Sequence, residues 1–270
     1  MACHTIHGGN DIELIVEVLG AGQPVLLVHG YSQSRMAWRK QLHSDLTTDL
    51  QLIAMDSRGH GESAKPHDAY DNPQLWADDL RSIVDALDID DIVLVGWSYG
   101  GLVVLDYLAS YGTDKVSGLN LVGGVFSIGT DVGTDLLGQE YLDLLPGFVS
   151  TDVEESTRTM CEFVDLCVHD TLPLEDRYYM LGYNMVVPPH VRDSLRSRHE
   201  KHDVTLSELD VPVLLTHGTE DAVVLPEASQ LYADLVDDAE LSFYPETGHS
   251  PFWEQPERFN RELHTFALDL

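Results

Sequence analysis

The segment Ile92-Val-Leu-Val-Gly-Trp-Ser98-Tyr-Gly-Gly101 is the most informative part of the chain. Its first residues form a short, continuous apolar run, which is typical of a buried parallel strand. Glycines then stand close to Ser98 on both sides, and an apolar pattern with helical spacing continues from Gly100 to Ser110. Small residues let neighbouring backbone pass close to a tight turn. The segment therefore predicts a strand, a tight turn centred on Ser98 and a helix.

The same succession of strand and helix recurs on both sides of this segment. Further runs with the length of buried strands are residues 24–28, 51–55, 118–122 and 212–216. Helical patterns lie at residues 36–50, 73–87, 226–235 and 256–268. Pro73, Pro226 and Pro256 stand where helices would begin, a position that favours proline. This alternation predicts an α/β fold with a mostly parallel sheet, entered through an antiparallel strand near residues 13–19.

The stretch from about residue 126 to residue 204 interrupts the alternation. Its apolar residues recur at helical intervals, as in residues 157–166 and 175–185. We expect a helical cap at residues 126–204, inserted into an α/β core that consists of residues 1–125 and 205–270. The alternative is that these helices merely flank the sheet.

Three residues have the chemistry and the chain order of a catalytic triad. Ser98 is the centre of a Gly-x-Ser-x-Gly motif between a predicted strand and helix, as in a nucleophile elbow. A serine hydroxyl is a weak nucleophile, so it needs a base, and the base needs an orienting carboxylate. Asp221 follows the strand at residues 212–216, and His249 lies in the loop before the last helix. Glu220 is the alternative acid, although its motif position is less suitable.

With these motifs the chain resembles the α/β-hydrolase superfamily over essentially its full length. Further matches are His-Gly-Tyr at residues 29–31, Asp-Ser-Arg-Gly-His-Gly-Glu-Ser at residues 56–63 and Gly-His-Ser-Pro-Phe at residues 248–252. Within the superfamily, the pattern is similar to the capped esterase and cofactor-free haloperoxidase-like branch. The resemblance implies an α/β-hydrolase fold, with a mostly parallel eight-stranded sheet flanked by helices and an inserted helical cap.

The resemblance also implies an acyl-enzyme mechanism that needs no cofactor and no metal. Ser98 would attack a carbonyl carbon, His249 would remove its proton and Asp221 would hold the imidazole. The backbone N–H groups of Tyr31 and Tyr99 would form the oxyanion hole, where each donor is worth about 3 kcal/mol in the transition state.

Other residues in these motifs have side chains that could act in catalysis, but their motif positions indicate structural roles. His29 and His60 could serve as bases by residue type, but their motif positions match structural or loop roles. Asp56 and Arg58 are expected to pin their loop. Residues 199–202, His-Glu-Lys-His, lack the spacing of a zinc protease, and we expect them on a solvent-exposed face of a cap helix.

The identity of the predicted nucleophile, a serine, makes some reactions of this superfamily less suitable than others. Haloalkane dehalogenases and epoxide hydrolases of this superfamily carry an aspartate where this chain has Ser98, so carboxylic ester hydrolysis is the leading interpretation. The candidate residues for the substrate pocket are aromatic: Trp97, Phe126, Tyr141, Tyr179 and Tyr183. A cap and aromatic walls would suit a small or medium uncharged acyl ester. The alternative for the cap aromatics is that they form the core of the cap.

Three other functions stay open at this point. Perhydrolysis through a peracid, which gives haloperoxidase activity, uses the same triad. Carbon–carbon bond hydrolysis of dienoic diketones is a second, although Trp97 stands where those enzymes often have a small polar residue. A ligand-sensing α/β-hydrolase that turns over slowly or not at all, like some plant hormone receptors, is the third.

The composition excludes several classes of partner. The 270 residues include 15 Lys and Arg against 46 Asp and Glu, so the formal net charge is 15 − 46 = −31. The 43% of hydrophobic residues provide a large core, unlike an acidic disordered tail. A polyanion without a basic patch is repelled by nucleic acids and anionic membranes, so we expect neither as a partner. The partner that the resemblance implies is a small-molecule ester or a related acyl substrate.

Charge distribution and the chain start bear on the native environment. The acidic residues are spread through the chain, and this composition resembles that of proteins from salt-accumulating halophiles. The start has no secretory signal, and no apolar run is long enough to span a bilayer. The three cysteines are expected to be reduced thiols. We therefore expect a cytoplasmic protein of a salt-accumulating organism, with its oligomeric state left open.

Overall fold

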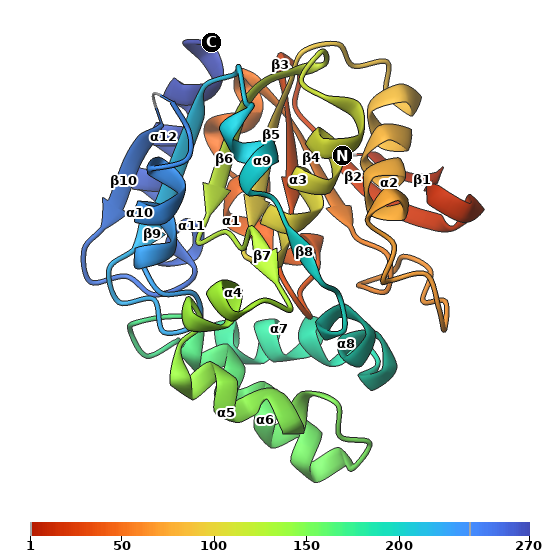
Figure 1. Ribbon diagram of the computed structural model, residues 1–270, viewed down its shortest axis with the longest axis vertical. Coiled ribbons are helices and arrows are strands. Elements are labelled where there is room, and N and C mark those ends of the chain that lie inside the picture. The colour runs from red at the N-terminus through yellow and green to blue at the C-terminus, as the bar shows by residue number, and fades with distance from the viewer. Residues whose placement is uncertain (1, 238) are drawn as a thin grey trace.

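A computed structural model describes residues 2–237 and 239–270, and its centre is an eight-stranded sheet (Figure 1). The strand order is β1-β2-β4-β3-β5-β6-β9-β10. β1 and β2 run antiparallel to their neighbours, and every pair from β4 to β10 is parallel. The predicted fold class is thereby confirmed. The strands are β1 (Ala2–His7), β2 (Glu13–Leu19), β3 (Gln23–Val28), β4 (Leu50–Asp56), β5 (Ile92–Trp97), β6 (Val116–Val122), β9 (Val213–Gly218) and β10 (Glu240–Tyr244).

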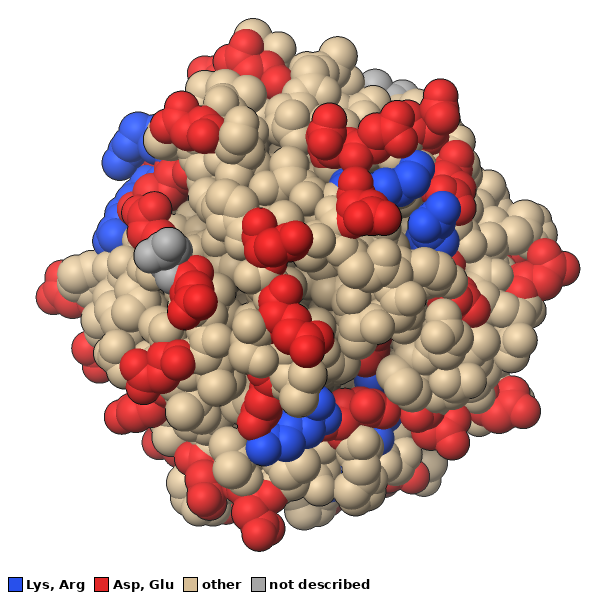
Figure 2. Space-filling view, turned by 45° about the horizontal axis from the view of Figure 1, so that its top comes forward, with Lys and Arg blue, Asp and Glu red and all other residues tan. Residues whose placement is uncertain are grey.

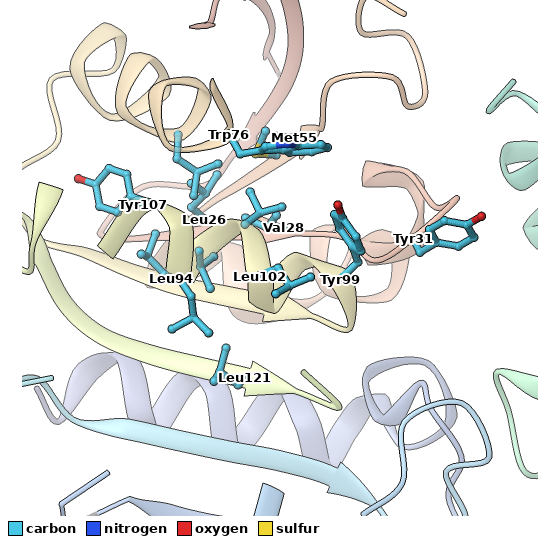
Figure 3. Close-up of a cluster of buried hydrophobic side chains, with 14 of the residues drawn as sticks. Leu26, Val28, Tyr31, Met55, Trp76, Leu94, Tyr99, Leu102, Tyr107 and Leu121 are labelled. Carbon is cyan, nitrogen blue, oxygen red and sulfur yellow. The ribbon is translucent and has the colours of Figure 1, made fainter. Parts of the chain in front are cut away.

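Both faces of the sheet are covered, because the central strands are apolar on two sides. Alternate residues of β3 and β5 enter opposite clusters: Leu26 and Leu94 pack on one face, Val25 and Val93 on the other. Figure 3 shows the first cluster, with α2 and α3 over the sheet. The covering helices are α1 (Arg39–Leu42), α2 (Pro73–Ala86), α3 (Tyr99–Tyr111), α10 (Glu227–Ala233), α11 (Pro251–Glu254) and α12 (Pro256–Leu268), and η1 (Gly9–Asp11) is a 3-10 turn.

The prediction of one helix over residues 36–50 is wrong. The segment consists of the short α1 between two 3-10 turns, η2 (Arg35–Trp38) and η3 (Asp45–Thr48). Ser44 interrupts it, because its hydroxyl donates to the carbonyl of Gln41 and accepts from the N–H of Leu46. Short polar side chains that bond the local backbone in this way compete with continuation of a helix.

Five further helices gather at one end of the molecule, between β6 and β9 in the chain (Figure 1). They are α4 (Asp131–Asp135), α5 (Gln139–Phe148), α6 (Val153–Leu166), α7 (Leu174–Met185) and α8 (Pro189–Arg196). The antiparallel strands β7 (Ser127–Ile128) and β8 (Glu200–Lys201) lie at the two ends of this group, and α9 (Asp203–Ser207) follows. The helical prediction for residues 157–166 and 175–185 is confirmed.

The prediction of an exposed helix face at residues 199–202 is wrong. Glu200 lies in β8, and His202 is buried with Nε2 3.1 Å from Oδ1 of Asp106 on α3. Asp106, Glu200 and His202 are close enough together to hold a metal ion. However, the guanidinium of buried Arg198 donates to both oxygens of Asp106 at 2.9 and 2.7 Å, so a cation already neutralises this carboxylate. The pairing joins distant segments and has no signal in local spacing.

Acidic side chains are scattered over the face that Figure 2 shows, with few lysines and arginines among them. In residues 2–237 and 239–270, no helix has the length and apolar character needed to cross a membrane.

Candidate active site

Ser98 is the single residue that separates β5 from α3. Its backbone has φ 54° and ψ −120°, a left-handed conformation that is strained for a serine. The turn fits because the neighbouring glycines allow close approach: a Cβ on Gly100 would lie 2.4 Å from the carbonyl oxygen of Val28, and one on Gly30 2.9 Å from Cβ of Ser98. Ser98 is 7% exposed and lies at the carboxyl end of the sheet, as the sequence predicts.

Asp221 and His249 form a buried pair. Nδ1 of His249 is 2.7 Å from Oδ2 of Asp221, and Oδ1 of Asp221 accepts from the N–H groups of Val223 and Val224 at 2.9 and 3.0 Å. Burial alone would raise the pKa of Asp221, but His249 and a second histidine, His217, outweigh it and hold the pKa well below its ordinary value. Asp221 is therefore ionised at neutral pH.

His217 was not predicted as a site residue; it lies near the end of β9, four residues before Asp221. Its Nε2 is 3.1 Å from Oδ2 of Asp221 and 2.9 Å from the carbonyl oxygen of Val224, so this nitrogen carries the proton. Its Nδ1 is 2.7 Å from Oγ of Ser229. The carboxylate of Asp221 is thus held from both sides.

Ser98 follows β5, and Asp221 and His249 follow β9 and β10, so all three lie at the carboxyl edge of the sheet, with β6 between β5 and β9. The indole Nε1 of Trp97 donates to the carbonyl oxygen of His249 at 2.8 Å, and Ser98 donates its N–H to the carbonyl of Val122 at 3.0 Å. A Cβ on Gly123 would lie 3.1 Å from both Oδ2 of Asp221 and Nδ1 of His249. Among the described residues, Oγ of Ser98 makes no hydrogen bond to the imidazole; in unliganded sites this bond is often formed only with substrate.

Two backbone N–H groups near Ser98 have no acceptor among the described residues. They are the N–H groups of Tyr31 and Tyr99. Tyr99 is the first residue of α3, where N–H groups have no partner in the helix and the helix dipole favours negative charge. Tyr31 follows Gly30 in the loop between β3 and η2, residues 29–34, which we call the β3–η2 loop. Figure 3 places both tyrosines at the same end of the core.

A small cavity of about 10 Å³ lies next to Trp97, about the size of one water molecule. Its walls come from the core and from α6 and α7: Gln33, Trp97, Val164, Cys167, Met180, Tyr183, Asn184, Ser250 and Phe252. Burial raises the pKa of the Cys167 thiol, so it stays protonated and is a poor nucleophile. An ester cannot enter this cavity without movement of its walls.

The structure divides the aromatic pocket candidates. Trp97 and Tyr183 border the cavity. The other three are outside its walls. Phe126 packs on Tyr232, Tyr141 on Phe148 and Phe163, and Tyr179 on Trp253.

The remaining motif residues hold loops together. Arg58 binds both oxygens of Asp79 at 2.7 Å, and Asp56 pairs with Arg35, so both have the pinning role expected of them. The pKa values of His29 and His60 are lowered, mainly by burial, and both side chains bond to backbone groups.

Known proteins resemble the whole chain. A family model described as the alpha/beta hydrolase fold matches residues 23–256. The crystal structure of the esterase RhEst1 from Rhodococcus sp. ECU1013 is 36% identical with a TM-score of 0.93, and the match covers 99% of this chain and 98% of that one. Non-heme chloroperoxidase CPO-A1 from Kitasatospora aureofaciens is 28% identical, covering 95% of this chain and 96% of the relative. 2-Hydroxy-6-oxo-2,4-heptadienoate hydrolase from Pseudomonas putida is 26% identical, with 94% and 92% covered.

The chain therefore belongs to the α/β-hydrolase family, as an enzyme of the branch that includes esterases and non-heme haloperoxidases.

Proposed function

We propose that this protein is a serine hydrolase that cleaves small to medium carboxylic esters through an acyl-enzyme intermediate. The observation that carries the proposal is the buried His249–Asp221 pair beside a serine held in a left-handed turn. In this role Ser98 is the nucleophile, His249 the general base and Asp221 the orienting acid.

The proposed reaction has two halves. Oγ of Ser98 attacks the ester carbonyl while Nε2 of His249 takes its proton, and Asp221 stabilises the imidazolium through Nδ1. The N–H groups of Tyr31 and Tyr99 bind the oxyanion. The C–O bond then breaks, and the alcohol leaves with the proton from His249. Water repeats the sequence on the acyl-enzyme and releases the acid.

We further propose that residues 126–204 form a cap over the site on a core of residues 1–125 and 205–270. Side chains of α6 and α7 wall the cavity beside Trp97, which supports this division. Because the cavity is so small, the cap must move to admit an ester. Tyr183 and Trp97 are the proposed contacts of the acyl group; Phe126, Tyr141 and Tyr179 would act only after such a movement.

The similarity to the esterase RhEst1, at 36% identity, supports ester hydrolysis over the alternatives. The chloroperoxidase relative supports perhydrolysis as the second candidate, since it requires the same triad. Carbon–carbon bond hydrolysis is supported by the heptadienoate hydrolase relative, but the bulky Trp97 occupies the position next to the nucleophile. A ligand sensor would bind without multiple turnover.

A substrate panel separates these functions. p-Nitrophenyl esters of increasing acyl length, a thioester, a lactone and a dienoic diketone are assayed in about 2 M KCl, with and without peroxide and bromide. We expect multiple turnovers that are fastest on short or medium esters, and none by Ser98→Ala, which should fold normally. Turnover retained by Ser98→Ala would remove Ser98 as the nucleophile. A single turnover by the unmodified enzyme would instead favour the sensor.

A further inference from the structure

Arg192 on α8 is a buried cation without an acidic partner. Arg192 is 1% exposed. No carboxylate of the described residues lies within 4.0 Å of its guanidinium. Burial lowers its pKa below the ordinary arginine value. A buried charge is costly unless it is paired, and this chain has three acidic residues for each basic one. The other two fully buried arginines, Arg58 and Arg198, both bind a carboxylate.

The guanidinium of Arg192 instead bonds to neutral oxygens on four separate segments. Nε donates to Oγ of Ser32 in the β3–η2 loop at 3.0 Å. Nη2 donates to the carbonyl of Asn184 on α7 at 2.9 Å, and Nη1 to the carbonyl of Phe148 on α5 at 3.3 Å and Oγ of Ser156 at 3.5 Å. One side chain thus joins the cap helices to a core loop.

Ser32, the core residue that Arg192 contacts, is next to a proposed oxyanion donor. Ser32 has φ 60°, a left-handed conformation that a serine adopts only when its surroundings hold it there. The residue before it is Tyr31, whose N–H points to no acceptor in the described structure. The hydroxyl of Tyr31 also donates to the carbonyl of Arg192 at 3.2 Å. Arg192 therefore contacts both Tyr31 and Ser32.

We propose that Arg192 is a positioning residue, which fixes the β3–η2 loop through Ser32 so that the Tyr31 N–H points at the oxyanion when the cap is closed. The inference rests on the proposed serine hydrolase function. This role also explains why Arg192 has no carboxylate partner. A carboxylate partner would compete with the neutral Ser32 hydroxyl for the guanidinium and place negative charge near the site where an oxyanion forms.

A different role, simple attachment of the cap helices to one another, makes different predictions. Loss of attachment would lower stability and the fraction of active molecules, but not the rate of those that remain folded. A misplaced oxyanion donor lowers kcat in folded molecules with little effect on KM, because it acts in the transition state. Displacement of a catalytic group by about 1 Å can cost about 100-fold.

The test is a double-mutant cycle on Arg192→Met and Ser32→Ala, with kcat divided by the active-site concentration from fluorophosphonate titration. We expect each single variant to lower kcat about 10- to 100-fold with KM changed less than about threefold. The double variant should be no more than about threefold slower than Arg192→Met, because both changes break one connection. Arg192→Lys, which keeps the charge on a single donor nitrogen, should recover part of the rate.

Arg196→Met is the matched control, because Arg196 lies one turn further along α8 and, among the described residues, bonds only to the carbonyl of Leu145, inside the cap. Its kcat per active site should be unchanged. Multiplicative losses in the double variant, or normal kcat per active site in Arg192→Met, would overturn the role of Arg192. If Arg192→Met does not fold, a normal kcat in Ser32→Ala would overturn it equally. Turnover by Ser98→Ala would overturn the proposed function itself, a separate result.

Discussion

Gly123 is the residue at which backbone conformation and the geometry of the proposed triad meet. It has φ +48°, and a Cβ there would lie 3.1 Å from Oδ2 of Asp221 and from Nδ1 of His249. We predict that Gly123→Ala lowers kcat at least about 10-fold, because the methyl group pushes on the pair that orients the base. Stability should also fall, by about 1 kcal/mol, from the left-handed backbone.

Gly112→Ala is the control for Gly123→Ala. Gly112 has φ +67°, but nothing lies within 4 Å of its added Cβ. This variant should show the loss of stability in urea unfolding with kcat unchanged. Equal kcat values for the two variants would mean that the space beside the pair is not critical.

His60 predicts how stability depends on pH. Its Nδ1 is 2.9 Å from the carbonyl of Arg58, while its buried Nε2 has no partner among the described residues. Burial, helped by His29, holds its pKa well below the ordinary value of 6.5. Below that pH the unfolded chain takes up a proton that the folded chain does not, so the free energy of unfolding falls as pH falls.

We predict that His60 lowers the free energy of unfolding by about 1.4 kcal/mol for each pH unit below 6.5, and that His60→Gln removes this contribution to the slope. Urea unfolding between pH 7 and pH 5 measures the slope, and any constant loss from the substitution does not affect it. A slope unchanged in His60→Gln would rule out this assignment.

Residue roles could be predicted only where they carry a local motif. Ser98, Asp221 and His249 each follow a predicted strand in a recognisable loop, so sequence order suffices to propose them. Arg192 has no such signal, because its partners lie on segments 8 to 160 residues away in the chain. His217 does have a local signal, because it stands four residues before Asp221 in the same motif.

At the scale of elements, the central strands and long helices were predictable because burial imposes a strong pattern. Runs of apolar residues identify β3, β5 and β9 within two residues. Other elements were not predicted, among them β1, which precedes the first expected strand. Residues 36–50 carry a helical apolar pattern that Ser44 overrides through local hydrogen bonds. β8 is set by pairing with β7, and its two residues have no periodicity of their own.

The walls of the cavity predict which cap helix selects the acyl group. Tyr183 on α7 borders the cavity, whereas Tyr141 on α5 packs inside the cap. We predict that Tyr183→Leu moves the preferred p-nitrophenyl ester toward longer acyl chains, because it enlarges the cavity. Tyr141→Leu should lose stability without such a shift. Ratios of kcat/KM along an ester series measure both, and a shift in Tyr141→Leu alone would place the acyl group elsewhere.

At the scale of the whole molecule, the net charge of −31 is the dominant property. The active-site candidates need no excess acid, and Figure 2 shows acidic side chains spread over the face that it draws. We propose that this surface suits concentrated salt. Charges repel over about 30 Å at 10 mM salt but only about 3 Å at 1 M. The midpoint of thermal unfolding should therefore rise from 10 mM to 2 M KCl.

Choline chloride at equal ionic strength is the control for specific potassium binding, since screening alone should give a similar rise. A midpoint that is the same at 10 mM and 2 M KCl would contradict the proposed adaptation, without bearing on catalysis.

The central claim is an acyl-enzyme at Ser98, and peptide mass spectrometry after reaction tests it most directly. The unmodified enzyme is quenched with acid during turnover of p-nitrophenyl butyrate, because His249 serves as the base in both halves of the reaction and a variant without it would also form the intermediate slowly. We predict a single butyryl group, on the peptide that contains Ser98, and none in Ser98→Ala. A butyryl group on another residue, or ester turnover by the unmodified enzyme with Ser98 never modified, would contradict the account.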